Sequence, residues 1–266
     1  MKGKEAMAIT FQLSRRLAAI AGRIPRCGTL ADIGSDHALL PIHAVKAGLC
    51  RKAVAGDLHD GPLKAAMRNI AAAGLLDRID VRKGDGLGVL APGEADVVVI
   101  AGMGGATMTD ILAAGEDRLE GTGVLLLQPN VGARDVRRWL HDHGWYLRDE
   151  CVLEEDGVFY DILEAVPARP GEEERAARLY EPVAAGGGPV VAADLQFLLG
   201  PHLVRRPSRT FLDRWQAEIA KRERIIARMK NSDSPETAGK RERLEEETAK
   251  IREVLSCLRT VTPSSG

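Results

Sequence analysis

The sequence predicts an α/β fold, in which helices cover both faces of a mostly parallel sheet and a helical hairpin follows. Three observations predict this fold. Short apolar runs alternate with amphipathic stretches from Thr29 to about Val166, two strand-like runs around a turn end this alternation, and two seams at helical spacing follow. Strand–helix alternation predicts right-handed βαβ units and hence a parallel sheet.

Five apolar runs are expected to form the parallel strands, at residues 29–33, 52–57, 79–83, 95–101 and 122–128. Residues 97–100 and 124–127 are continuously apolar, which is typical of strands buried on both faces. The stretches between the runs, at 37–47, 62–73, 107–114 and 133–143, are expected to be helices.

Two further runs, at 145–153 and 159–165, are joined by Glu154, Glu155, Asp156 and Gly157, a turn of the Asp-Gly type. An antiparallel hairpin that ends an otherwise parallel sheet is the closing feature of the seven-stranded methyltransferase fold. A dinucleotide-binding domain normally adds another parallel crossover at this point. We therefore expect seven strands in residues 1–166, the last two of them antiparallel.

Residues 167–266 are expected to form a connector and a C-terminal helical domain. Residues 167–190 are rich in proline, glycine and charge and predict the connector. The first seam is Leu212, Trp215, Ile219, Arg222, Ile226 and Met229, and the second is Leu244, Thr248, Ile251, Leu255 and Leu258. Ser232, Asp233, Ser234 and Pro235 break the pattern between them. This predicts an antiparallel coiled-coil hairpin of two helices of about 20 residues, projecting from the sheet domain.

Cysteine usage and hydropathy exclude several classes of protein. The four cysteines are far apart and lack CxxC spacing, which argues against a zinc site or a disulfide framework. Residues 1–5 are charged and lead into no apolar region, so no secretory signal is expected. No apolar stretch approaches the roughly 20 residues of a membrane span. We expect a cytoplasmic protein without a bound metal.

The candidate cofactor site begins where the first strand ends, at Asp32, Gly34, Ser35 and Asp36. A glycine there lets a ligand approach the backbone, and the next helix offers free N–H groups. The GxGxxG motif that seats a pyrophosphate is absent, because Asp36 occupies its second glycine position. Acidic residues suit a ligand without phosphates, such as the sulfonium amino acid S-adenosylmethionine. The alternative is that Asp32 and Asp36 only cap the following helix.

Later strand ends add acidic and glycine residues. Asp57, with Leu58 beside it, lies about 20 residues beyond the glycine turn, where a carboxylate binds the two ribose hydroxyls. Asp85 and Gly86 follow the third strand, where an acidic side chain commonly meets the adenine amino group. The alternative for Asp57 is a solvated strand end. The alternative for Asp85 is a tight turn, which does not exclude that Asp85 also binds adenine.

The fourth and fifth strands end at the expected topological switch point, where open α/β sheets bind ligands. Gly102, Met103 and Gly104 end the fourth strand, and the three glycines within residues 101–105 indicate close packing of backbone against the cofactor. Asn130 ends the fifth strand, and its side chain is expected to face the same cleft. A purely structural role of Asn130 in the loop is an equal alternative.

In their order along the chain, these motifs resemble those of the bacterial tRNA (adenine-22, N1) methyltransferase family. The resemblance runs from about Leu13 to the C-terminal helices and is carried by residues 32–38, 40–41, 61–62, 84–86, 101–105, 127–130 and 155–157. It implies a class I methyltransferase fold, S-adenosylmethionine as methyl donor, tRNA as substrate and a C-terminal coiled-coil domain. Leu39 departs from the family, which usually has tyrosine at this position.

The implied reaction assigns Asp36 a catalytic role. N1 of adenine is itself a nucleophile, so the site must mainly position N1 in line with the methyl group. Methylation makes the base positive, and a carboxylate near the exocyclic amine stabilises that charge. Asp36 is the candidate, either by accepting a hydrogen bond from the amine or by deprotonating it, and His37 beside it is a candidate substrate-binding residue.

A basic segment marks the start of the C-terminal part. Residues 202–230 carry nine Lys or Arg against three Asp or Glu, and Arg205, Arg206 and Arg209 are candidates for phosphate contacts. A charged, solvated helix face is the alternative for the distal basic residues. Arg134, Arg137 and Arg138 are expected to form an ordinary solvated face.

Other functions remain open from sequence. The same fold can methylate another RNA or a small molecule. An NAD-dependent dehydrogenase is disfavoured by the missing GxGxxG and by the closing hairpin. The helical tail could instead serve oligomerisation of a non-catalytic adaptor, but Arg222 within the first seam and the break at Pro235 favour an intramolecular hairpin and a monomer.

Overall fold

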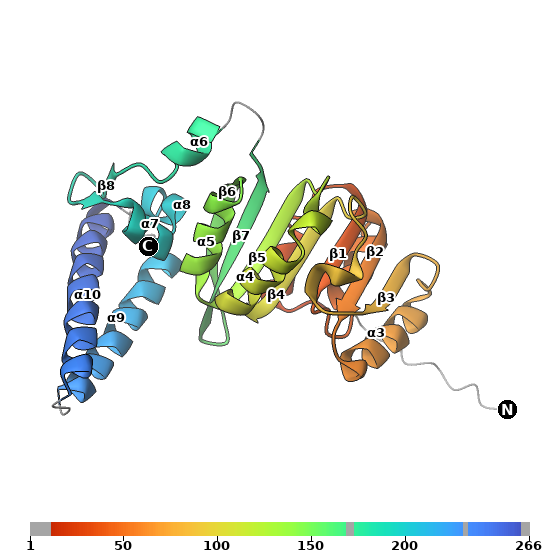
Figure 1. Cartoon of the computed structure of the whole chain (residues 1–266), viewed down its shortest axis with the longest axis horizontal. Coiled ribbons are helices and arrows are strands. Elements are labelled where there is room, and N and C mark those ends of the chain that lie inside the picture. Colours follow the sequence, from red (N-terminus) through yellow and green to blue (C-terminus); the bar gives the residue numbers. More distant parts are fainter. Residues whose placement is uncertain (1–11, 169–172, 231–233, 262–266) are drawn as a thin grey trace.

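A seven-stranded mixed sheet forms the centre of the computed structural model, which describes residues 12–168, 173–230 and 234–261. The strand order is β3-β2-β1-β4-β5-β7-β6 (Figure 1). The strands are β1 (Cys27–Ile33), β2 (Cys50–Asp57), β3 (Ile79–Lys83), β4 (Val97–Gly104), β5 (Val124–Val131), β6 (Trp145–Glu155) and β7 (Val158–Pro167). Strands β1 to β5 pair in parallel, and β7 is antiparallel to both of its neighbours, β5 and β6. All seven predicted strands are confirmed.

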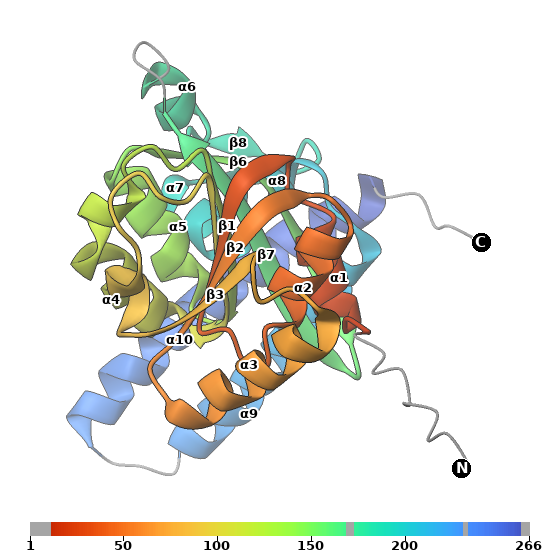
Figure 2. The ribbon, with the colours of Figure 1, turned by 90° about the vertical axis from the view of Figure 1, so that its right-hand side faces the viewer.

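Helices cover both faces of this sheet. Helices α1 (Arg15–Ala21), α2 (Leu39–Lys46) and α3 (Asp60–Ala73) lie on one face, and α4 (Gly105–Ala114) and α5 (Ala133–Asp142) lie on the other (Figure 2). Successive strand residues serve opposite faces: Leu30 packs in the α1–α3 core and Ala31 in the α4–α5 core. Because both faces are buried, the strands have continuous apolar sequences rather than alternating ones.

The chain reverses its direction of travel across the sheet between β1 and β4. It runs outward from β1 to β3 and then returns to β4 on the other side of β1. Ligands of open α/β sheets bind at the carboxyl ends of the strands beside such a switch point. Since β7 is antiparallel to β5, the β6–β7 turn lies at this same carboxyl edge.

The predicted connector contains more regular structure than expected. It includes α6 (Glu173–Arg178) and a small sheet of β8 (Val183–Ala184) and β9 (Val190–Val191), followed by α7 (Ala193–Leu199) and α8 (Pro201–Arg205). The buried amide Nε2 of Gln196 donates to the carbonyls of Tyr180, Glu181 and Val191 at 2.7–3.3 Å. The side chain of Gln196 thus provides hydrogen bonds for backbone carbonyls in a segment whose composition predicted only irregular structure.

The C-terminal helices α9 (Arg209–Met229) and α10 (Pro235–Val261) form the predicted hairpin. Leu212 and Trp215 of α9 are buried with Ile251 and Leu255 of α10, which confirms the predicted seam. Helix α10 has 27 residues rather than about 20, because it already begins at Pro235. Proline is tolerated at the first position of a helix, since the N–H that it lacks would have no partner within the helix there. The predicted break at Ser232 and Asp233 and the N-terminal residues 1–5 lie outside the described residues.

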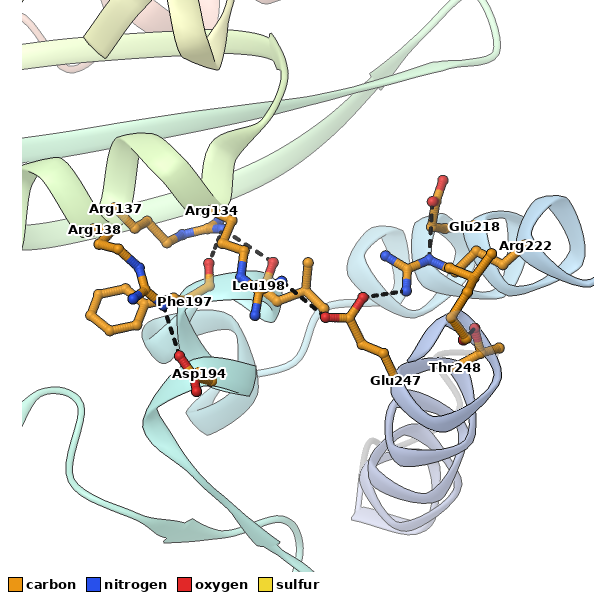
Figure 3. Close-up of polar contacts among 11 residues, drawn as sticks. Arg134, Arg137, Arg138, Asp194, Phe197, Leu198, Glu218, Arg222, Glu247 and Thr248 are labelled. Carbon is orange, nitrogen blue, oxygen red and sulfur yellow. Dashed lines mark hydrogen bonds and ion pairs between the residues drawn. The ribbon is translucent and has the colours of Figure 1, made fainter. Parts of the chain in front are cut away.

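The prediction of a solvated arginine face on α5 was wrong for Arg137. Arg137 is only 1% exposed, and its guanidinium bonds Glu150 Oε2 at 2.8 Å and Asp161 Oδ1 at 3.2 Å. It also donates to the carbonyl of Phe197 at 3.1 Å (Figure 3). Burial lowers the pKa of Arg137, but the charges of Glu150 and Asp161 more than offset this effect and raise the pKa above its usual value.

The two neighbouring arginines of α5 also contact the C-terminal part (Figure 3). Arg134 pairs with Glu247 of α10 at 2.9 Å, and Arg138 pairs with Asp194 of α7 at 2.7 Å. Arg137 thus reaches β6 and β7 of the sheet, whereas Arg134 and Arg138 reach α10 and α7 of the C-terminal part.

We expect Arg137→Met to lower the free energy of unfolding by about 3–5 kcal/mol, because it leaves Glu150 and Asp161 as buried, unneutralised carboxylates. Urea unfolding measures the change. Arg138→Met is the matched control and should cost no more than about 1 kcal/mol, because its pair with Asp194 is exposed. Equal losses for the two variants would contradict this account of the buried charges.

Candidate functional site

The turn after β1 folds back onto the end of β2. The amides of Gly34 and Ser35 both donate to the carbonyl of Gly56, at 2.8 and 2.9 Å. The buried carboxylate of Asp32 accepts a 2.6 Å hydrogen bond from Ser35 Oγ. Gly34 has φ +75°, and a Cβ at this position would overlap Met103 Cε. The positive φ favours glycine in this turn, and the side chain of Met103 packs against the space that a Cβ would take.

The next residues continue in an unusual backbone conformation. His37 and Ala38 both have positive φ, at 64° and 52°, and α2 begins only after them, without a side-chain cap. The alternative that Asp32 and Asp36 cap this helix is therefore wrong. Left-handed conformations of residues other than glycine store strain and concentrate at functional sites. Here they hold Asp36 and His37 at the surface, 68% and 53% exposed, with Asp36 Oδ1 3.2 Å from His37 Nε2.

A cavity of about 390 Å³ opens at the carboxyl edge beside this turn. Predicted site residues from four strand ends line it, namely Gly34, Asp57, Leu58, Asp85, Gly86, Gly102 and Met103. Gly104 lies just beyond as the N-terminal flanking residue of α4. The structure thus brings together the predicted residues that follow β1, β2, β3 and β4.

The lining of the cavity fits a nucleoside better than a phosphorylated ligand. Asp57 Oδ1 accepts from the amide of His59 at 2.8 Å, and the side chain of Asp85 makes no capping hydrogen bond. Leu58 and Ile111 supply apolar surface, and Leu58 is 51% exposed. Carboxylates suit ribose hydroxyls and an exocyclic amine, whereas they repel phosphates. The residues present therefore fit the adenosine part of S-adenosylmethionine.

Amide side chains from β5 hold the end of β4 in place. Gln128 Oε1 accepts from the amide of Gly102 at 3.1 Å, and Gln128 Nε2 donates to Asn130 Oδ1 at 3.1 Å. Asn130 Nδ2 in turn donates to the carbonyl of Gly102 at 2.8 Å. Both polar atoms of the predicted substrate residue Asn130 are therefore used to brace Gly102, whose φ is +80°.

Arg16 is a residue of this edge that the sequence analysis missed. Its Nη1 donates to Gln128 Oε1, and its guanidinium lies over the ring of Tyr160 at 5.4 Å. The first amides of α1 donate to the carboxylate of Glu155 in the β6–β7 turn, which fixes where Arg16 lies. No motif marks Arg16, because it reaches the edge only when α1 packs against this hairpin.

Asp32 has a pKa raised to about 6. Burial is the main cause, and the charge of Asp57 adds to it. The hydrogen bond from Ser35 and the positive charge of Arg16 lower the pKa and offset only part of the rise. Asp32 is thus an acid that the fold destabilises in its charged form.

The predicted phosphate-binding arginines lie away from this edge. Arg206 pairs with Asp149 at 3.3 Å, and Asp149 lies about 20 Å along β6 from its end at Glu155. Arg209 pairs with Asp213 at 3.0 Å, and both Arg206 and Arg209 remain largely exposed. Arg205 donates to Gln196 and to the carbonyl of Pro201, each at 2.8 Å.

Within the described residues, no His, Cys, Asp and Glu side chains form a group of three that could hold a metal ion. None of the helices in that part of the chain has the length and apolar character needed to cross a membrane.

We expect Asp32→Asn to gain stability relative to the wild type as the pH rises. Because the fold raises the pKa of Asp32, its protonated carboxyl group stabilises the folded state fully below the ordinary pKa of 3.8. This stabilisation is lost as the pH rises through about 6. Asparagine does not titrate, so the free energy of unfolding of Asp32→Asn minus that of the wild type should increase by up to about 3 kcal/mol over this interval. Urea unfolding at several pH values measures it, and a difference independent of pH would contradict the assignment.

Comparisons with known proteins show which family the chain resembles. The model of the tRNA (adenine(22)-N(1))-methyltransferase family matches residues 30–255. The chain is 39% identical over 236 residues to the tRNA (adenine(22)-N(1))-methyltransferase of Bacillus subtilis (strain 168), covering 89% of this chain and 92% of that protein.

Solved structures show the same fold. The crystal structure of the Bacillus subtilis tRNA methyltransferase TrmK superposes with a TM-score of 0.80 at 36% identity, covering 92% of this chain and 100% of that one. A candidate tRNA methyltransferase of Streptococcus pneumoniae, solved with S-adenosyl-L-methionine, gives a TM-score of 0.75 at 32% identity, with the same coverage of both chains. The expected methyltransferase fold is confirmed, and the chain belongs to the tRNA (adenine(22)-N(1))-methyltransferase family.

Proposed function

We propose that this protein transfers a methyl group from S-adenosylmethionine to N1 of adenine 22 in tRNA. One observation carries the proposal: in a chain of this family, the cavity that fits adenosine lies beside a strained turn that presents an exposed carboxylate, Asp36. When bound, S-adenosylmethionine supplies a methyl group made electrophilic by its positive sulfur.

The residues of the cavity divide the binding of the adenosine part among them. Asp57 accepts hydrogen bonds from the ribose hydroxyls, and Asp85 accepts one from the adenine amine. Leu58 and Ile111 cover the apolar faces of the adenine ring. Gly34 and Gly102 line the cavity at the ends of β1 and β4, with the side chain of Met103 against Gly34.

Asp36 acts on the target base rather than on the cofactor. Its carboxylate does not line the adenosine cavity and is open to solvent at the rim. There it accepts a hydrogen bond from the exocyclic amine and stabilises the positive charge that develops on the base. His37 lies next to it and contacts the same nucleotide. Because N1 lies on the pairing edge, the adenine must first leave its base pair, at a cost of a few kcal/mol.

The rest of the tRNA contacts the C-terminal part. Arg206 and Arg209 bind phosphates at a distance from the reaction edge, and Arg205, fixed by Gln196, borders the same surface. We assign methyl transfer to residues 1–166 and tRNA docking mainly to residues 167–266. The closed α9–α10 hairpin supports a monomer that acts on tRNA in the cytoplasm.

Transfer of labelled methyl groups to transcribed tRNA tests the proposal. The purified protein should label a transcript with adenine at position 22 and should leave its matched transcript with guanine at that position at background, because the second offers no free N1 lone pair. Equal labelling of the two transcripts would refute the assigned target.

Two variants separate catalysis from cofactor binding. Asp36→Asn should lower kcat/KM for tRNA by about a hundredfold, because the amide loses the negative charge that stabilises the methylated base, and should keep the affinity for S-adenosylhomocysteine. Asp57→Asn should weaken that affinity by about tenfold or more through the lost ribose hydrogen bonds. Calorimetry and initial rates measure the two effects. The assignment of Asp36 fails if Asp36→Asn turns over normally while Asp57→Asn loses cofactor affinity.

A further inference from the structure

Cys27 and Cys50 lie side by side at the amino ends of two neighbouring strands (Figure 1). Cys27 is the first residue of β1 and Cys50 is the first residue of β2, and the two are partners in the parallel register of these strands. The amide of Cys27 donates to the carbonyl of Leu49 at 2.9 Å, which fixes this register. The sheet thus brings together two cysteines that are far apart in the sequence.

The placement of the two cysteines is compatible with a disulfide, although both are free thiols in this structure. Neighbouring strands lie about 4.8 Å apart, and register partners carry their side chains on the same face of the sheet. Cys50 belongs to the α1–α3 core and Cys27 packs against that core, so both thiols lie on this face. A disulfide needs Cα atoms about 4.4–6.8 Å apart, a range that includes the spacing of neighbouring strands.

The two thiols differ in exposure and in acidity. Cys50 is only 2% exposed, whereas Cys27 is partly open to solvent. A hydrogen bond between the two side chains lowers the pKa of Cys27, although burial and the charge of Asp96 act in the opposite direction. The same hydrogen bond, together with burial, raises the pKa of Cys50. Cys27 is therefore the thiol that an oxidant reaches first and that is more readily present as the reactive thiolate.

We propose that Cys27 and Cys50 form a reversible redox modification site, in which a peroxide oxidises Cys27 and Cys50 then closes a disulfide with it. The Cys27 thiolate attacks one oxygen of hydrogen peroxide, the O–O bond breaks, and a sulfenic acid and hydroxide form. This hydroxide takes the proton of Cys50, whose thiolate attacks the sulfenic sulfur and displaces a second hydroxide. The second hydroxide takes up the proton that Cys27 had released to the solvent. In sum, the two thiols lose two electrons and two protons, and hydrogen peroxide is reduced to two water molecules.

The thiol pair lies at the edge of the sheet opposite the cofactor cavity. Strand β1 has seven residues, so Cys27 lies about 20 Å along the strand from Ile33 at its carboxyl end. The disulfide would close the segment of residues 27–50, which contains β1, the turn after it and α2. In the cytoplasm, which we propose for this protein, disulfides are usually transient and respond to oxidants. The pair is thus suited to capture an oxidant reversibly, away from the cavity.

Treatment of the folded, full-length protein with hydrogen peroxide tests the site, with alkylation of the remaining thiols and mass spectrometry as the readout. The wild type should lose two hydrogen atoms, give one linked peptide pair that contains Cys27 and Cys50, and return to its starting mass with a thiol reductant. Cys50→Ser should instead let Cys27 gain two or three oxygen atoms, because no second thiol captures its sulfenic acid. Cys27→Ser should slow the loss of the Cys50 thiol by about tenfold or more, because Cys50 is buried. Cys151→Ser is the matched control and should form the same bond as the wild type.

A wild type that keeps both thiols under peroxide, or that links Cys27 to Cys151 or Cys257, would overturn the proposal. A bond between Cys27 and Cys50 that forms only in urea would overturn it as well, since the bond would then need an unfolded chain. The bridged protein should unfold at a higher temperature than the reduced protein, because the bond restricts residues 27–50 in the unfolded chain. A lower midpoint would show that the sheet does not accommodate the bond and would also contradict the proposal.

Discussion

The buried guanidinium of Arg137 is the interaction on which the arrangement of the two parts depends. Its charge is neutralised by Glu150 of β6 and Asp161 of β7. Glu150 also accepts from the amide of His202 at the start of α8, and Asp161 also pairs with Arg214 of α9. Arg137 also bonds the carbonyl of Phe197 in α7, so six elements meet around one cation. Such a cluster adds little net stability over an apolar core. Any other packing of these elements would leave a buried charge without its partner, so the cluster favours a single arrangement of the elements.

This constraint extends to the reaction edge. The cluster fixes the β6–β7 hairpin, and Glu155 in the turn of that hairpin holds the first amides of α1. Helix α1 brings Arg16 to Gln128, and Gln128 with Asn130 holds the peptide of Gly102. A chain of direct contacts thus links the C-terminal helices to the residues around the cofactor cavity. The helical part and the site are built as one unit.

The turn after β1 places two acidic side chains in different environments. Asp32 is buried beside Ser35, whereas Asp36, four residues later, is exposed, because the backbone passes through left-handed conformations at Gly34 and His37. The first acid is turned into the fold, and the second is open to solvent. The strain stored in this turn is the physical basis for assigning them different roles.

Much of the fold and part of the site could be predicted from sequence. Strand ends such as Asp57, Asp85 and Gly102 are marked by local patterns, and the carboxyl ends of parallel strands meet at one edge. Arg137 could not be predicted, because its partners Glu150 and Asp161 lie on strands that no local pattern connects to this position of α5. Arg16 could not be predicted either, since its role depends on contacts with Gln128 and Tyr160, more than a hundred residues away.

Nucleoside mapping by mass spectrometry identifies both the atom and the position that receive the methyl group, which we propose to be N1 of adenine 22. Transcribed tRNA is incubated with the protein and isotopically labelled S-adenosylmethionine and then digested, both to oligonucleotides and to nucleosides. We expect labelled 1-methyladenosine, confined to the oligonucleotide that contains position 22. Label on another nucleoside, on the exocyclic amine of adenine or at another position would contradict it.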